Sequence, residues 1–385
     1  MSDPHAQTIL RPPASLGVIG GGQLGRMFVQ AAQRMGYRAG VLGAIPEGPG
    51  AQVAHWSVIG PPDNFEALLL FAGMAEGATV EFENVSAPAL RWLARRMPVR
   101  PGWKTVWVSQ NRLREKTFLA RHGIPVAPWK SVQTAEELAG AVETLGCPLI
   151  LKTATSGYDG KGQARVDEPA DAMLAWNQLG RVPCVAEGWV RFASEVSVVV
   201  ARGRDGQAVT FPVALNCHDR HILDSTVMPA PVGPIVSQEC RELALAIAQA
   251  LGTVGVLTVE FFLTEDGRLM VNEIAPRPHN SGHLTIEAAV ANQFEQQVRA
   301  LCGLPLGGTE LTSPAAMVNL LGDLWKDGEP DWDAALRNDS GVKLHLYGKR
   351  TAAPGRKMGH ISVMDRDPTT ALDRALAARA VLTRR

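Results

Sequence analysis

The segment Val254–Ile274 constrains the fold of this chain more than any other. It reads VGVLTVEFFLTEDGRLMVNEI, two apolar runs on either side of Asp266 and Gly267. An Asp-Gly pair between two such runs is the strongest short-range signal of a β-hairpin. If these two residues form the turn, Glu265 faces Arg268, and every other pairing along the two strands follows from that register.

That register places Glu260 opposite Glu273. Facing residues of a hairpin have β-carbons roughly 5 Å apart, and like charges at that distance repel each other. The repulsion is relieved when a cation lies between the carboxylates, or when one of them is protonated. Oxygen ligands at this spacing suit Mg²⁺, which takes one or two carboxylates together with substrate phosphates. The hairpin therefore predicts a magnesium–nucleotide site, with a solvated pair of glutamates on an open face as the alternative.

The N-terminal part of the chain predicts a parallel sheet covered by helices. A strand at Leu16–Ile19 is followed by the glycine turn Gly20–Gly25, a helix over Gln23–Met35 and a second strand at Tyr37–Leu42. This βαβ order requires parallel strands with both faces covered. The turn reads GGGQLG and fits the G-x-G-x-x-G pattern of anion-binding turns at helix N-termini.

The glycine turn does not predict a dinucleotide site. Such a site also needs an acidic residue about 20 positions later, at the end of the second strand. That strand ends in Val41-Leu42-Gly43-Ala44, without Asp or Glu. NAD and an NAD-binding oxidoreductase are therefore disfavoured, and a single phosphate or another small ligand fits better. Alternatively, these glycines serve only to let the strand and the helix pack tightly together.

Strand and helix patterns alternate along the rest of the chain, which is typical of α/β and α+β proteins. Helices are expected over Gln110–His122, from Thr134 to Gly146 and over Ser237–Leu251. Thr134 and Glu137 form a capping box at the start of the second of these helices. Further strands are expected at Pro148–Thr153, Cys184–Glu187, Val196–Ala201 and Val209–Val213. The segments Pro98–Pro101 and Trp103–Val108 predict a boundary. We expect an N-terminal domain over 1–108, a central domain over 109–306 with subdomains 109–187 and 188–306, and a C-terminal domain over 307–385.

Composition limits the partners of the protein. The formal net charge is zero, which argues against nucleic acid or an anionic membrane as a partner. Five scattered cysteines without a C-x-x-C pair predict reduced thiols. The chain starts without a signal-peptide pattern, and no apolar run approaches the about 18 residues of a membrane-spanning helix. We expect a soluble cytoplasmic protein that acts on small molecules.

A second glycine-rich stretch, Ser156–Gln163, reads SGYDGKGQ and follows the strand that carries Lys152. Three glycines with a lysine predict a loop that closes over phosphates. The G-x-x-x-x-G-K-[ST] pattern of a Walker loop is missing, and an ordinary surface turn is the alternative.

The stretch Asn272–His283 brings polar side chains to the end of the hairpin. Its Asn, Ser and Arg residues are suited to bind an anion, and a helix is expected to follow from Leu284. His279 and His283 are four residues apart, as in helical metal sites, but Pro276 and Pro278 predict a loop, so a histidine–metal site is not expected.

In this order, the motifs resemble those of the ATP-grasp superfamily, and more narrowly those of the N5-carboxyaminoimidazole ribonucleotide synthetases of purine biosynthesis. The resemblance runs from about Leu16 to His360. It rests on GGGQLGRM, TVEFENV (79–85), QNRLREKTFL (110–119), GYDGKGQ, NEIAPRPHNSGH and PGRKMGH (354–360). GYDGKGQ and PRPHNSGH are very specific, whereas formate-dependent glycinamide ribonucleotide transformylase is similar at GGGQLG. The resemblance implies an ATP-grasp fold with an N-terminal Rossmann-like domain and a small C-terminal domain, assembled as a homodimer.

The resemblance also implies a reaction. The family uses ATP to carboxylate 5-aminoimidazole ribonucleotide with bicarbonate. Bicarbonate attacks the γ-phosphate to form carboxyphosphate, and this intermediate, or the carbon dioxide it releases, meets the exocyclic amine of the ribonucleotide.

The family's site residues carry over by motif, with Arg112 and Lys152 on the ATP phosphates, Glu187–Val190 at the adenine and Glu195 on the ribose. The full ATP set is Arg112, Lys152, Gly157, Tyr158, Asp159, Gly160, Lys161, Gly162, Gln163, Glu187, Gly188, Trp189, Val190, Glu195, His218, Asn272 and Glu273. Glu260 and Glu273 are the expected ligands of the metal, which is Mg²⁺ or alternatively Mn²⁺. The ribonucleotide set is Gly22, Gln23, Leu24, Glu83, Tyr158, Asp159, Arg277, Asn280, Ser281, Gly282, His283, Lys349 and Arg356. Lys152, Arg277 and His283 are expected to be catalytic.

The sequence departs from the family near its C-terminus. Where the family often reads K-x-E-x-R-P-G-R-K-M-G-H, Thr351 and Ala353 replace the Glu and the first Arg, while Lys349 and Arg356 are retained. This puts the detail of phosphate binding in doubt. The alternatives are another ATP-grasp carboxylate–amine ligase, the formate-dependent transformylase, or an inactive nucleotide-binding protein.

Overall fold

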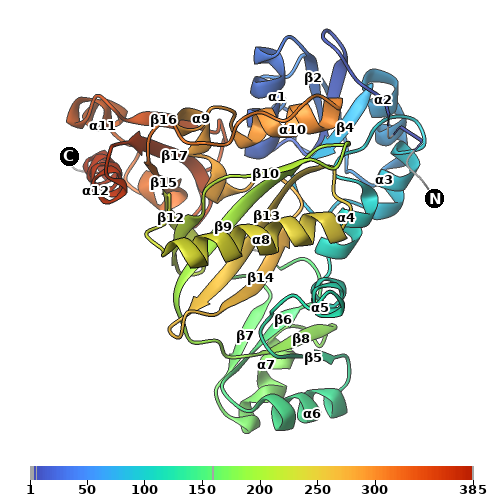
Figure 1. The fold of residues 1–385 in the computed structure, drawn as a ribbon, viewed down its shortest axis with the longest axis vertical. Coiled ribbons are helices and arrows are strands. Elements are labelled where there is room, and N and C mark those ends of the chain that lie inside the picture. Colours follow the sequence, from blue (N-terminus) through green and yellow to red (C-terminus); the bar gives the residue numbers. More distant parts are fainter. Residues whose placement is uncertain (1–3, 6, 158–159, 384–385) are drawn as a thin grey trace.

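The structure is a computed structural model of the chain, and it describes residues 4–5, 7–157 and 160–383. In Figure 1 the N-terminal domain lies at the upper right, a small sheet lies at the bottom, and a long sheet runs between them. Within the described residues, no helix is long and apolar enough to cross a membrane. All five cysteines are free thiols.

The N-terminal domain is built on a four-stranded parallel sheet in the order β3-β2-β1-β4. Its strands are β1 (Ser15–Ile19), β2 (Arg38–Gly43), β3 (Trp56–Ile59) and β4 (Gly77–Val80). Its helices are α1 (Gln23–Arg34), α2 (Phe65–Met74) and α3 (Ala87–Leu93). The predicted βαβ opening is confirmed, because β1, α1 and β2 follow one another and β1 pairs with β2 in parallel.

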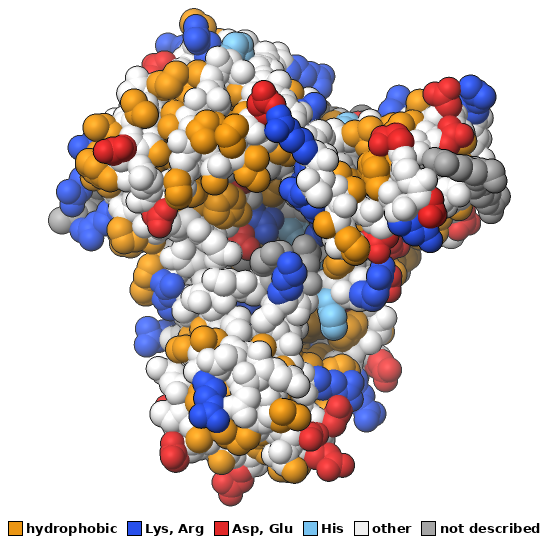
Figure 2. All heavy atoms as spheres, turned by 180° about the vertical axis from the view of Figure 1, so that it is seen from behind, with side chains coloured by type: hydrophobic (Ala, Val, Ile, Leu, Met, Phe, Trp, Pro, Cys, Tyr) orange, Lys and Arg blue, Asp and Glu red, His pale blue; other side chains and the backbone are white. Residues whose placement is uncertain are grey.

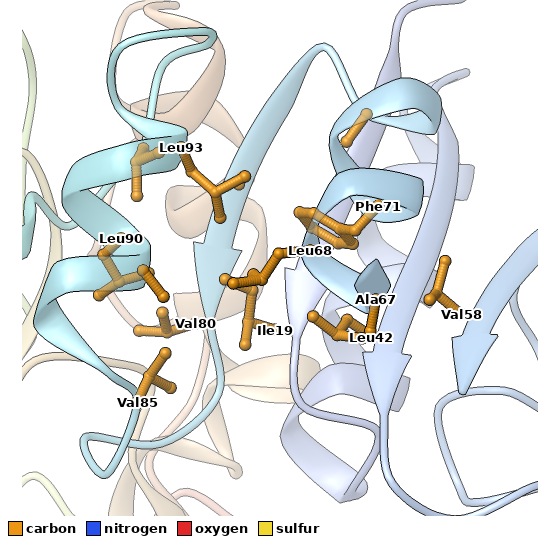
Figure 3. Close-up of a cluster of buried hydrophobic side chains, with 14 of the residues drawn as sticks. Ile19, Leu42, Val58, Ala67, Leu68, Phe71, Val80, Val85, Leu90 and Leu93 are labelled. Carbon is orange, nitrogen blue, oxygen red and sulfur yellow. The ribbon is translucent and has the colours of Figure 1, made fainter. Parts of the chain in front are cut away.

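Helices cover both faces of this sheet, as its apolar strands require. On one face, Leu68 and Phe71 of α2 and Leu90 of α3 pack on strand residues such as Ile19 (Figure 3). On the other face, α1 packs with α10 (Gln293–Cys302), which comes from far along the chain (Figure 1). The N-terminal sheet is therefore completed by a helix that the sequence analysis assigned to the central domain.

A small antiparallel sheet lies at the bottom of Figure 1, with its strands in the order β5-β8-β6-β7. Its strands are β5 (Trp129–Val132), β6 (Leu149–Thr153), β7 (Gln163–Val166) and β8 (Cys184–Gly188). The helices α6 (Ala135–Leu145) and α7 (Ala172–Gln178) pack against it. Thr134 caps α6 as predicted, because its side-chain oxygen accepts the N–H of Glu137 at 3.2 Å.

The largest sheet has nine strands, with eight in the order β14-β13-β9-β11-β12-β15-β17-β16 and β10 paired with β9. The strands of its central part are β9 (Phe192–Arg202), β10 (Ala208–Thr210), β11 (Ala214–Asp219), β12 (Ile222–Met228), β13 (Gly255–Thr264) and β14 (Leu269–Ala275). The C-terminal strands are β15 (Ala315–Leu321), β16 (Lys343–Leu346) and β17 (Lys357–Met364). Because β15 pairs with β12, the C-terminal part continues the central sheet.

The remaining helices are α4 (Trp103–Ser109), α5 (Arg112–Arg121), α8 (Pro234–Ala250), α9 (Thr285–Ala288), α11 (Trp332–Asn338) and α12 (Pro368–Ala380). The predicted boundary segment Trp103–Val108 lies within the helix α4, which packs against both α3 and α5. The helix expected after Leu284 is only the four-residue α9.

The hairpin of β13 and β14 places Glu260 opposite Glu273, so this prediction is confirmed. Its turn, however, is one residue longer than predicted. The N–H of Thr264 donates to Arg268 O at 2.9 Å, and Gly267 adopts a φ of 81° inside this loop. A bulge at Asn272 then shifts the register back by one residue.

Candidate active site

A cavity of about 970 Å³ lies where the three sheets meet. Figure 2 shows a hollow between the upper and lower parts of the molecule, with charged side chains inside it. Its wall contains Gln23, Leu24, Glu83, Arg112, Lys152, Gly157, Gly160, Gln163, Glu187, Gly188, Trp189, Val190, Glu195, His218, Glu260, Asn272, Glu273, Arg277, Asn280 and His283 of the expected site residues. Gly22, Lys161, Gly162, Ser281, Gly282, Lys349 and Arg356 lie outside the wall, and Tyr158 and Asp159 fall outside the described residues.

Each carboxylate of the hairpin pair has a cationic or histidine partner. Glu260 Oε1 lies 2.8 Å from His279 Nε2, and Glu273 Oε2 lies 3.1 Å from Arg112 Nη1. Burial favours the neutral form of Glu260, but His279 and His218 outweigh it and lower the pKa of Glu260 to about 2. Glu260 is therefore ionised at neutral pH, and partners from the protein relieve the repulsion that the sequence predicts.

The two carboxylates also fit a hard cation. Each uses one oxygen for its protein partner and keeps a second oxygen. Within the described part of the chain, no cluster of three or more His, Cys, Asp or Glu side chains could hold a metal. A cation bound by Glu260 and Glu273 would therefore need further oxygen ligands, which nucleotide phosphates and water supply for Mg²⁺.

Two lysines share the buried carboxylate of Glu187. Lys152 Nζ lies 2.8 Å from Oε2 and Lys116 Nζ lies 3.3 Å from Oε1. Lys152 also donates to Asn272 Oδ1 at 3.4 Å, and Lys116 donates to Asn272 O at 3.2 Å. Burial favours the neutral carboxyl, but the two lysines outweigh it and lower the pKa of Glu187 to about 2. Only Lys152 reaches the cavity wall, so only Lys152 can turn to a ligand while Lys116 holds Glu187.

This arrangement predicts the effect of Lys116→Met. Without Lys116, Lys152 would be the only cation on Glu187, and it could bind the phosphate that the resemblance implies only by leaving that carboxylate unpaired. We expect the KM for ATP to rise about tenfold, which corresponds to about 1.4 kcal/mol. Steady-state kinetics with ATP varied checks this, with Lys130→Met on an exposed position of β5 as the matched control. An unchanged KM for ATP would show that Lys116 serves only the packing of α5.

The loop that follows Lys152 depends on two of its glycines. Gly160 and Gly162 have φ angles of 77° and 72°, which side chains rarely adopt. A β-carbon on Gly160 would lie 2.6 Å from His221 Cβ, and one on Gly162 would lie 2.5 Å from Thr153 Oγ1. The loop is therefore held close to the turn between β11 and β12, at the edge of the cavity.

One end of the cavity is suited to a nucleoside. Apolar side chains of Ile150, Leu223 and Phe262 line it beside the segment Glu187–Val190. Glu195 accepts from His218 Nδ1 at 2.7 Å across β9 and β11. Burial lowers the pKa of His218, but the bond to Glu195 outweighs it and the pKa is raised overall.

The N-terminal glycine turn binds a carboxylate of the same chain. Glu81 Oε1 accepts the N–H of Gly22 and Oε2 accepts that of Gly25, both at 2.6 Å. The interpretation of this turn as an open anion site is therefore corrected, because the N–H groups of Gly22 and Gly25 already donate to Glu81. Gln23 and Leu24 between them remain at the cavity wall.

An ion pair links the N-terminal domain to the loop after β14. Arg277 Nε donates to Glu83 Oε2 at 2.7 Å, and both side chains line the cavity. Burial opposes the charge on Glu83, but the Arg277 guanidinium outweighs it and lowers the pKa of Glu83. The guanidinium is thereby fixed at the cavity wall.

Gln293 determines how His283 presents its ring to the cavity. The amide of Gln293 is oriented by the backbone of His279, whose N–H donates to Oε1 and whose O accepts from Nε2, both at 2.8 Å. Since Nε2 is the donor, His283 Nδ1 at 3.0 Å accepts from it, and the proton of a neutral ring lies on Nε2. Burial, together with His279 and His345, lowers the pKa of His283 well below its usual range. His283 is therefore a neutral hydrogen-bond donor.

Asn280 adds unused hydrogen-bonding capacity to the same wall. It is buried and lines the cavity, and neither its Nδ2 nor its Oδ1 has a partner among the described residues. Buried amides are nearly always satisfied in folded proteins, so this side chain indicates a polar ligand.

Sequence reasoning missed several residues of this site. Lys116, Glu81, His279 and Lys357 interact with or line the cavity, and none was assigned a role beforehand. Lys116 and Arg112 are one turn apart on one helix, which was an available signal. Glu81 and Glu83 alternate after a strand, but a local pattern does not show which partner each one finds.

Comparisons with known proteins agree with this geometry. Models of the ribonucleotide synthetase preATP-grasp domain, the ATP-grasp domain and the phosphoribosylaminoimidazole carboxylase C-terminal domain match residues 14–110, 117–294 and 315–374. The chain is 43% identical to N5-carboxyaminoimidazole ribonucleotide synthase of Bacillus subtilis (strain 168), over 93% of both chains. It is similar to the crystal structure of an ADP complex of N5-carboxyaminoimidazole ribonucleotide synthetase, with 40% identity, a TM-score of 0.91 and coverage of 97% and 98%. The Aspergillus clavatus enzyme in complex with ADP and 5-aminoimidazole ribonucleotide is 33% identical, with a TM-score of 0.88 and coverage of 97% and 99%.

The fold and the site define an ATP-dependent ligase of the ATP-grasp class. Because relatives this similar match over nearly the whole length, the class can be narrowed. The chain belongs to the N5-carboxyaminoimidazole ribonucleotide synthase family.

Proposed function

We propose that this protein carboxylates 5-aminoimidazole ribonucleotide with bicarbonate at the expense of ATP, and releases N5-carboxyaminoimidazole ribonucleotide, ADP and phosphate. One observation carries the proposal. A single cavity has the lysine and carboxylate pair of a nucleotide site on one side and the Glu83–Arg277 pair with Asn280 and His283 on another. Its volume of about 970 Å³ suits two ligands side by side.

The nucleotide half is expected to hold ATP with its adenine beside Glu187–Val190 and its phosphates near Lys152 and Arg112. Lys152 exchanges its bond to Glu187 for a phosphate oxygen, and the glycine loop covers the phosphates. Mg²⁺ held by Glu260 and Glu273, with Mn²⁺ as the alternative, would neutralise phosphate charge when bound.

The acceptor half brings bicarbonate and the ribonucleotide together. A bicarbonate oxygen attacks the γ-phosphorus, the bond from phosphorus to the bridging oxygen breaks, and ADP leaves with the electron pair. The exocyclic amine then attacks the carbon of carboxyphosphate, or the carbon of the CO₂ that it releases, and loses a proton to solvent as the C–N bond forms. The C–O bond to the phosphoryl group breaks, and phosphate leaves with its electron pair. Arg277 and the Nε2–H of His283 are suited to hold the anionic oxygens during both steps.

The decisive test is ADP release measured with each substrate omitted in turn. We expect ADP only when ATP, bicarbonate and 5-aminoimidazole ribonucleotide are all present, with one carboxylated product per ADP by mass spectrometry. Dependence on formate and glycinamide ribonucleotide would instead identify the transformylase alternative. We further expect a cytoplasmic homodimer, which sedimentation analysis of the purified protein checks for its oligomeric state.

The C-terminal loop that carries Lys349 and Arg356 leads to a separate prediction about the binding of the ribonucleotide. Gln52 Nε2 donates to Gly348 O at 2.7 Å, so this loop lies against the N-terminal domain. Lys349 is close enough to Glu81 for their charges to interact. If Lys349 and Arg356 hold the phosphate monoester, Arg356→Ala should lose about 1.5–3 kcal/mol of binding free energy. The KM for the ribonucleotide should therefore rise about tenfold to a hundredfold.

The KM for ATP should not change in Arg356→Ala, because the loop lies outside the nucleotide half. Kinetics with each substrate varied checks both values, and Arg366→Ala on an exposed position serves as control. Loss of ATP affinity, with the ribonucleotide KM intact, would contradict the assignment.

A further inference from the structure

The side chain of Glu81 lies against the glycines of the N-terminal turn. A β-carbon on Gly20 would lie 2.0 Å from Glu81 Cγ, one on Gly22 would lie 2.8 Å from Oε1, and one on Gly25 would lie 2.9 Å from Oε2. Real β-carbons essentially never approach other atoms this closely. Gly20 and Gly22 therefore leave room for one carboxylate that arrives from the end of β4. A β-carbon on Gly25 would also meet the backbone O of Gly20 at 2.7 Å, and Gly20 has in addition a φ of 122°.

The carboxylate replaces the anion that such a turn otherwise takes from a ligand. Its two bonds to backbone N–H groups are short, at 2.6 Å, and they join residues 59 and 56 positions apart. Burial raises the pKa of Glu81, while the two N–H groups and the nearby charges of Lys349 and Arg277 oppose that rise. Glu81 therefore fixes the path of the backbone from Gly22 to Gly25.

This fixed segment is part of the cavity wall. Gln23 and Leu24 lie between the two bonded glycines, and both line the cavity together with Glu81. Two residues further on, Glu83 holds Arg277. A single short stretch after β4 thus fixes two parts of the wall, the glycine turn through Glu81 and the guanidinium through Glu83.

We propose that Glu81 is a positioning residue for the ribonucleotide, whose carboxylate holds the glycine turn in the shape that presents Gln23 and Leu24 to the substrate. The inference rests on the proposed function, because it takes these two residues as ribonucleotide contacts. Because Glu81 would act through the turn, its loss is expected to affect the ribonucleotide and not ATP.

The test is chemical rescue of Glu81→Ala in the full-length protein. This substitution removes a methylene and a carboxylate, which are the groups of acetate. We expect the KM for the ribonucleotide to rise about tenfold or more, while the KM for ATP stays within about twofold. Added acetate should restore the ribonucleotide KM, and acetamide, which has the same shape without the charge, should not.

Two further variants make the test specific. Glu81→Gln keeps the packing but not the charge, and it should raise the same KM even if Glu81→Ala does not fold. Glu76→Gln is the matched control, because Glu76 Oε1 also accepts a backbone N–H, that of Ser15 at 2.8 Å, before β4 and outside the cavity wall. It should leave both KM values unchanged.

Three results would overturn the proposal. They are an unchanged ribonucleotide KM in a folded Glu81 variant, an equal rise in both KM values, and a raised KM in Glu81→Ala that acetate does not lower. Failure of the proposed function is recognised separately, because the wild-type protein would then release ADP without any dependence on the ribonucleotide.

Discussion

Replacing Glu273 with Gln should abolish turnover while leaving the protein folded. The amide keeps the size of the side chain and can still accept from Arg112, but it removes one of two charges that face each other across the hairpin. If that charge binds Mg²⁺, the substitution removes about 3 kcal/mol of transition-state stabilisation. This lowers kcat about a hundredfold or more. Initial rates over a range of Mg²⁺ concentrations measure both the loss and the expected shift of half-saturation to higher metal.

The melting temperature of this variant should change little. Glu273 is partly exposed, and the relief of repulsion with Glu260 offsets the weaker contact to Arg112. Glu265→Gln, at the exposed tip of the same hairpin, is the matched control and should keep full activity. Near-normal turnover of Glu273→Gln at ordinary Mg²⁺ would remove the metal assignment.

Lys152→Met should abolish ATP use for a different reason. Lys152 is the cavity-facing cation of the pair on Glu187, so its loss takes a phosphate ligand from the site. We expect a fall in kcat/KM for ATP of about a hundredfold to a thousandfold, about 3–4 kcal/mol. Titration with ATP by calorimetry should show the loss in binding directly, with Lys130→Met as control.

The stability of the lysine variants distinguishes this site from an ordinary buried ion pair. Removing one partner of a buried pair usually costs about 3–5 kcal/mol, because the other charge is left alone. Here each single variant leaves Glu187 with one lysine, since Lys116 and Lys152 both contact it. We therefore expect small effects on unfolding from either substitution and the full cost only in Lys116→Met/Lys152→Met. A full loss of stability in either single variant would contradict the shared arrangement.

The hairpin illustrates how far local sequence reasoning reaches. Glu260 and Glu273 face each other as predicted, although the predicted pairings nearer the turn were one residue out of register. The loop is longer because Gly267 adopts a positive φ and Thr264 pairs with Arg268. A bulge at Asn272 compensates, and the extra residue brings its amide to Lys152. The correct pairing thus came from two one-residue differences that cancel.

The histidine beside the hairpin shows what local reasoning leaves out. The polar residues after β14 were predicted as a loop suited to an anion, and Arg277, Asn280 and His283 do line the cavity. The state of His283 nevertheless depends on Gln293, a residue of α10 that packs against the N-terminal sheet. No pattern within the loop indicates which ring nitrogen carries the proton.

By itself, the sequence determined the elements whose causes are short in range. The parallel N-terminal strands, the cap of α6 and the facing glutamates follow from side-chain period, turn residues and neighbouring hydrogen bonds, and these act over a few residues. Only the tertiary structure decided which charges meet, because a charge finds its partner through the path of the whole chain. That path places Glu81 in a glycine turn 56 residues away, pairs Arg277 with Glu83, and joins the C-terminal strands to the central sheet through β12 and β15.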